Sequence, residues 1–87
     1  MDGTPDLNLL RVFAAVAEAK SFSGAARTLG LPKSSVSRAV ARLEEELGVE
    51  LLQRTTHVVS LGAPGEALLR KIAPHLSALE DAASALK

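Results

Sequence analysis

Side chains that could catalyse a reaction or hold a metal are scarce in this sequence. It contains no cysteine, so disulfides and thiolate metal sites are excluded, and its two histidines, His57 and His75, lie far apart along the chain. No nucleophile stands beside a base, no metal-ligand cluster occurs, and no glycine-rich loop carries the lysine of a phosphate site. We therefore expect no enzyme activity, no metal and no cofactor.

The remaining chemistry is that of cations and hydroxyl groups. With 10 basic and 10 acidic residues the net charge is zero, which argues against a domain that is basic throughout. The charges are unevenly distributed, however, because residues 19–43 contain five basic residues and no acidic one, and three glutamates follow at 44–46. This segment is either a locally basic binding surface or an ordinary solvated surface of mixed charge.

Three helices are predicted to position these side chains. Apolar residues recur at helical spacing in 6–19, 24–29 and 33–47, with Asp6 as a plausible N-cap of the first segment. Gly30 and Gly48 each follow a helical segment and can adopt the left-handed conformation that ends helices. The apolar stripes comprise Leu9, Leu10, Phe13, Val16 and Ala17 in the first helix, and Val36, Ala39, Val40, Leu43 and Leu47 in the third.

The second and third segments have the pattern of a helix-turn-helix. Such a unit needs a small residue where its helices cross, a left-handed turn residue and apolar residues that hold the second helix. Ala26 suits the crossing and Gly30 the turn, and the apolar positions are Leu29, Leu31, Val36 and Ala39. An ordinary pair of packed helices with a glycine turn would give a similar pattern.

If the apolar stripe of 33–47 is buried, the opposite face carries only short or cationic side chains: Lys33, Ser34, Ser37, Arg38 and Ala41. A helix with such a face fits the major groove of DNA, where lysine and arginine reach guanine or phosphate oxygens and serine contacts either. The face is therefore a candidate for nucleic-acid recognition.

Residues 50–61 change character, since apolar positions flank a polar centre as in two short strands and a tip. Pro64 then stands where a first-turn proline is tolerated, and the chain from there to Lys87 is rich in helix formers. We expect one domain at 1–62, containing three helices and a hairpin, followed by a long helix at 63–87.

The last helix has a heptad seam with steps of three, four, three, four and three residues. Its positions are Leu69, Ile72, Leu76, Leu79, Ala83 and Leu86. The seam favours dimerisation through a partner helix, the alternative being packing against the chain's own core, which the first three helices are expected to cover by themselves. Pro74 is expected to bend this helix, and His75 to be merely packed or solvated.

Several short motifs, in order and spacing, resemble the N-terminal domain of LysR-type transcriptional regulators over nearly the whole chain. They are Phe22-Ser23-Gly24-Ala25-Ala26, Val36-Ser37-Arg38, Leu43-Glu44-Glu45-Glu46-Leu47-Gly48-Val49, Leu51-Leu52-Gln53-Arg54-Thr55 and Gly65-Glu66. The resemblance implies a mainly α fold: a winged helix-turn-helix with a recognition helix at 33–47, a wing at 51–61 and a dimeric linker helix.

The resemblance also implies the partners and the contacting residues. Double-stranded operator DNA would be bound by Ser23, Lys33, Ser34, Ser37, Arg38, Arg42, Arg54, Thr55 and His57. Lys33, Ser34 and Arg38 match groove-reading positions, whereas Ser37 and Arg54 match phosphate-contacting ones. The domain would be a homodimer through the linker helix, with higher oligomers in full-length proteins, where a separate domain binds a small-molecule effector. We expect this chain to be a fragment that ends before such a domain.

The sequence departs from the family pattern at three places. Many members have glutamine at Lys33 and a hydroxyl N-cap at Pro32, so base preference cannot be transferred. The wing tip usually carries arginine where His57 stands, so the contact there would be weaker and pH-dependent, or His57 is a solvated loop residue. The helix after the wing lacks the capping threonine that commonly precedes Gly65, and its first turn is expected to fray.

The cellular setting follows from what the sequence lacks. No uninterrupted apolar run is long enough to cross a bilayer, and the first residues do not form a secretory signal, so we expect a soluble cytoplasmic protein without membrane contact. The resemblance implies that the protein is bacterial. A different function class stays open at this point: a small helical dimer whose basic face binds an acidic protein surface. Salt-dependent binding to duplex DNA would separate the two.

Overall fold

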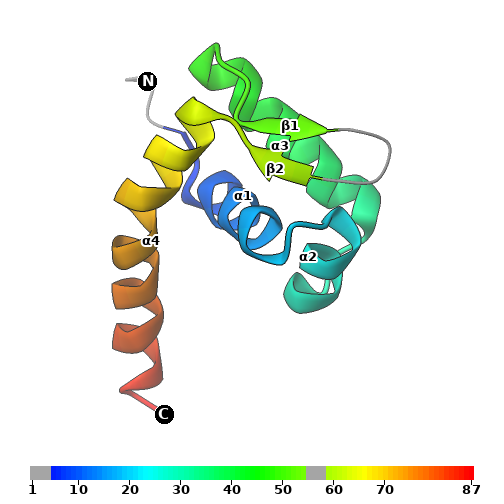
Figure 1. Cartoon of the computed structure of the whole chain (residues 1–87). Coiled ribbons are helices and arrows are strands. Elements are labelled where there is room, and N and C mark those ends of the chain that lie inside the picture. Colours follow the sequence, from blue (N-terminus) through cyan, green and yellow to red (C-terminus); the bar gives the residue numbers. More distant parts are fainter. Residues whose placement is uncertain (1–4, 55–58) are drawn as a thin grey trace.

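The computed structural model describes residues 5–54 and 59–87. Helix α1 (Leu7–Ala19), α2 (Phe22–Leu29) and α3 (Lys33–Leu47) precede strands β1 (Leu52–Arg54) and β2 (Val59–Leu61), and α4 (Ala63–Ser84) follows. Figure 1 shows α1 to α3 grouped beside the small sheet, with α4 leading away from them. The mainly helical, winged helix-turn-helix fold expected from the sequence is confirmed.

Local signals define the helix ends. The Asp6 carboxylate accepts a hydrogen bond from the Asn8 N–H at 2.7 Å, and the Ser21 hydroxyl oxygen accepts one from the Gly24 N–H at 2.9 Å. Gly30 and Gly48 have φ values of 68° and 72°, the left-handed conformation that ends α2 and α3. The expected N-cap at Asp6 and both glycine turns are therefore confirmed, although α2 begins two residues earlier than the predicted segment.

The core lies where α1, α2 and α3 meet the start of the wing. Phe13 and Val16 of α1 and Val36, Val40 and Leu43 of α3 are each 0% exposed. Two sequence expectations are wrong here. Leu31, in the turn before α3, is 41% exposed, and Leu47, the last residue of α3, is 37% exposed.

The wing is a two-stranded antiparallel sheet, as predicted. Leu52 pairs with Leu61, Gln53 with Ser60 and Arg54 with Val59. Leu51 and Leu52 are 1% and 3% exposed, so the beginning of β1 belongs to the core. The tip residues Thr55, Thr56, His57 and Val58 lie outside the described part of the chain, and the predicted contacts of Thr55 and His57 lie there with them.

Helix α4 divides into two parts. Leu68, Leu69 and Ile72 pack against the core, so the expectation that the first three helices cover the core without α4 is wrong. Leu79 and Leu86 are 55% and 90% exposed, and Figure 1 shows this end of α4 projecting away from the body. The helix continues past Pro74, and the bend expected there stays a prediction. Among the described residues, no helix combines the length and apolarity that a membrane span requires.

Candidate nucleic-acid interface

Helix α3 carries two opposed faces. Val36, Val40 and Leu43 are fully buried on one of them. On the other, Lys33, Ser34, Arg38 and Ala41 are exposed, and Ser37 is half-buried. This is the arrangement predicted from a rotation of about 100° per residue. The exposed face thus presents two cations, two hydroxyl groups and no bulky side chain.

The turn between α2 and α3 fixes the direction of the exposed face. The Leu31 N–H donates to the Ala26 carbonyl at 3.0 Å around the left-handed Gly30, and Ala26 is buried at the helix crossing as expected. No side-chain hydrogen bond caps α3 at Pro32. The first backbone N–H groups of such a helix are available to water or to an anionic ligand.

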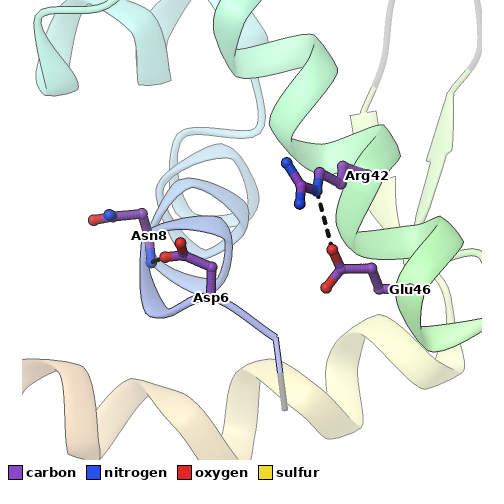
Figure 2. A network of polar contacts seen from close by, with 4 residues as sticks. All are labelled: Asp6, Asn8, Arg42 and Glu46. Carbon is purple, nitrogen blue, oxygen red and sulfur yellow. Dashed lines mark hydrogen bonds and ion pairs between the residues drawn. The ribbon is translucent and has the colours of Figure 1, made fainter. Parts of the chain in front are cut away.

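Arg42 lies one helical turn beyond Arg38 and is held by an acid of the same helix. Its Nε donates to Oε2 of Glu46 at 3.0 Å, and 71% of the Arg42 side chain is exposed (Figure 2). Arg38 and Arg42 both line a shallow surface groove of about 550 Å³, together with Leu9 of α1 and Glu45. The basic face of α3 is therefore bordered by acids on its C-terminal side.

The other predicted contacts come from separate elements. Ser23 is exposed in the first turn of α2, and the backbone of Arg54 ends β1. Five of the predicted residues thus share one helix: Lys33, Ser34, Ser37, Arg38 and Arg42. Within residues 5–54 and 59–87, no group of three acidic or histidine side chains is arranged to hold a metal ion.

Glu44 is the residue that sequence reasoning missed. Its Oε2 accepts hydrogen bonds from the backbone N–H groups of Leu51 at 2.9 Å and Leu52 at 3.2 Å. The side chain is half-buried and joins the C-terminal half of α3 to the start of the wing. In the sequence it looked like one of three equivalent surface acids, since no local signal marks a bond across seven residues.

Comparison with known proteins identifies the family to which the chain belongs. Residues 7–66 match the sequence profile of the bacterial regulatory helix-turn-helix proteins of the lysR family. The chain is a bacterial regulatory helix-turn-helix domain with a wing. It belongs to the LysR family, as its motifs predicted.

Over the aligned residues, curated relatives are close to half identical to the chain. A probable hydrogen peroxide-inducible genes activator of Mycobacterium avium is 44% identical over 81 residues, which are 93% of this chain and 25% of the relative. The transcriptional regulator PtxR of Pseudomonas aeruginosa is 46% identical over 79 residues, 91% of this chain and 25% of that protein. The chain thus spans about a quarter of the length of these relatives.

Solved structures agree with the fold. Oxidized OxyR of Corynebacterium glutamicum superposes with a TM-score of 0.91 at 38% identity, over the whole of this chain and 28% of OxyR. The BenM DNA-binding domain, solved in complex with catB site 1 DNA, has a TM-score of 0.85 at 34% identity, with 94% of this chain and 91% of that one covered.

Proposed function

We propose that this chain binds double-stranded DNA in a sequence-specific manner, as the DNA-binding domain of a LysR-type transcriptional regulator. The observation that carries the proposal is the exposed face of α3, on which Lys33, Ser34 and Arg38 stand opposite a fully buried apolar face. A helix of this kind fits the major groove. The likeness to the BenM domain, which was solved with DNA, favours duplex DNA over an acidic protein surface as the partner.

The side chains have different roles in this proposal. Lys33, Ser34 and Arg38 read base edges, because a cationic donor can reach guanine N7 and O6. Phosphates are contacted by Ser23, Ser37 and Arg42 from the helices, and by Arg54, Thr55 and His57 from the wing. Phosphate contacts position the helix without reading sequence. The local basic character of α3 matters more here than the net charge of zero.

We also propose that the domain is a homodimer through α4 in the cytoplasm, with residues 1–62 as the reading unit and 63–87 as the dimerisation helix. The exposed leucines Leu79 and Leu86 at the projecting end of α4 support this proposal. Leu69 and Ile72 contact the chain's own core, so the outer part of the seam would supply most of the interface. A two-fold dimer would present two copies of α3 to two half-sites.

The experiment that tests the function is a titration of random-sequence and selected duplexes at several salt concentrations. If a dimer places about three cations per subunit on phosphates, log K falls with log salt at a slope of about −5. Selection from a random duplex library should give a site with two related halves. Absence of duplex binding at low salt, or affinity that does not respond to salt, would contradict the proposal.

A further inference from the structure

The backbone of Leu51 links α3 to the N-terminal end of α4 through hydrogen bonds on both sides. On one side, the N–H groups of Leu51 and Leu52 donate to Oε2 of Glu44 on α3, at 2.9 and 3.2 Å. The Leu51 side chain is 1% exposed in the core, so the peptide cannot turn away from this carboxylate without losing buried contacts. Hydrogen bonds from backbone amides to an ionised carboxylate are among the stronger ones in proteins.

The opposite side of the same residue carries α4. The Leu51 carbonyl accepts a hydrogen bond from the N–H of Gly62, the N-cap of α4, at 3.1 Å. Gly65, in the first turn, packs directly on this carbonyl. A Cβ at position 65 would overlap the Leu51 oxygen and lie 3.0 Å from both the Leu51 carbonyl carbon and Leu61 Cδ2. The missing side chain of Gly65 is what allows α4 to approach Leu51.

The Leu51 peptide, bonded to Glu44 on one side and to Gly62 on the other, therefore helps to set the angle between α3 and α4, together with the packing of Leu68, Leu69 and Ile72 against the core. In a dimer formed through α4, this angle determines how far apart the two copies of α3 lie and how they point. Two-fold helix-turn-helix dimers bind half-sites about 34–36 Å apart, which is one turn of the DNA helix. A small change in the angle between α3 and α4 would therefore move one copy of α3 away from the major groove of its half-site.

We propose that the junction of Glu44, Leu51 and Gly65 sets the half-site spacing that the dimer accepts. Glu44 and Gly65 are positioning residues in this role, since they act through the Leu51 peptide and not by touching DNA. The inference rests on the proposed DNA-binding function and deepens it, because it assigns spacing selectivity to residues outside the reading face.

The test compares variants on duplexes in which two copies of the selected half-site are separated by spacers that differ by single base pairs, alongside a duplex with one half-site. Glu44→Met removes the acceptor at nearly constant length, and Gly65→Ala pushes α4 off Leu51. Wild type should prefer one spacer by about tenfold or more, and both variants should reduce this preference to about threefold or less. Affinity for the single half-site should change by no more than about twofold, because α3 keeps its side chains.

Two further variants serve as controls. Glu45→Met removes the same charge from the neighbouring exposed position and should keep the wild-type spacer profile. Glu44→Gln keeps an oxygen acceptor in place and should largely restore the profile that Glu44→Met loses. Thermal unfolding followed by circular dichroism identifies variants that are folded at the titration temperature. If Gly65→Ala is unfolded, the methionine and glutamine variants at position 44 decide the question.

The outcomes separate the two proposals. A wild type that binds no duplex refutes the proposed function itself. A wild type that selects a spacer, with folded Glu44→Met and Gly65→Ala proteins that select it equally sharply, overturns the junction alone. Equal loss of affinity on all duplexes, including the single half-site, also overturns it, because the variants would then merely weaken the fold.

Discussion

Arg42 and Glu46 form an ion pair on the exposed surface of α3, with Nε and Oε2 3.0 Å apart one helical turn from each other. Figure 2 shows the guanidinium and the carboxylate facing one another along the helix. An exposed pair at this spacing contributes about 0.3–0.5 kcal/mol to stability. A DNA phosphate could therefore compete with Glu46 for Arg42 at little cost.

This pair leads to the first prediction. Glu46→Gln should raise the affinity for duplex DNA about two- to fivefold at low salt, because it releases Arg42 and removes a charge that repels phosphate. The free energy of unfolding should change by less than about 0.5 kcal/mol. Fluorescence anisotropy titrations measure the affinity. Glu80→Gln, a matched change on exposed α4, should leave it unaltered, and an unchanged or lower affinity for Glu46→Gln would count against Arg42 as a phosphate contact.

The second prediction concerns base reading by α3. Arg38→Ala or Lys33→Ala should cost about 1–3 kcal/mol on the preferred site and relax the preference at one base pair. Both side chains are exposed, so stability should change by no more than about 0.5 kcal/mol. Competition titrations with specific and scrambled duplexes give the result. If both variants weaken the two duplexes by the same factor, these side chains do not read bases.

The third prediction distinguishes the proposed phosphate contact of Arg54 in the wing from base reading by α3. Arg54→Ala should weaken binding to preferred and scrambled duplexes alike, because a phosphate contact carries no sequence information. The slope of log K against log salt should become shallower by about one unit per lost contact. Titrations at four or more salt concentrations measure the slope. A loss confined to the preferred sequence would instead make Arg54 a base-reading residue.

The fourth prediction concerns the end of α4. Leu79→Asp should dissociate the dimer, because it places a charge where a partner leucine would pack. Ala78→Asp introduces the same charge about 130° from the middle of the seam, at a rotation of about 100° per residue, and should leave the dimer intact. Sedimentation velocity reports the mass of both variants. A wild type that stays monomeric at high concentration, or a dimeric Leu79→Asp protein, would exclude this interface.

The fifth prediction concerns how much the buried Leu43 side chain of α3 contributes to the stability of the fold. Leu43→Ala should lower the free energy of unfolding by about 2–5 kcal/mol, because it opens a cavity beneath α3. Leu43 is 0% exposed, whereas Leu7 is 59% exposed and lies outside the proposed dimer seam, so Leu7→Ala is the matched control and should have little effect on unfolding. Urea unfolding followed by circular dichroism gives both values. Equal stabilities would show that α3 is held by other contacts.

The sequence by itself determined most of the helices and strands and the exposed face of α3. Asp6, Gly30 and Gly48 mark helix ends through hydrogen bonds and backbone angles that involve only near neighbours, so their roles could be predicted from the residue type. The bounds of α3 and the exposure of Lys33 and Arg38 follow from a repeating apolar pattern, which records which side of a helix is buried.

Only the tertiary structure decided which apolar residues are buried and which contacts link α3 to α4. Leu31 and Leu47 fit the apolar pattern and are nevertheless exposed, because burial depends on where neighbouring elements end. Leu69 and Ile72 fit a dimer seam and yet contact the chain's own core. The hydrogen bond from the Leu51 N–H to Glu44 links residues 7 positions apart in the sequence. The contact of Gly65 with the Leu51 carbonyl links residues 14 positions apart. Such contacts depend on the path of the chain between the residues, which no local pattern encodes.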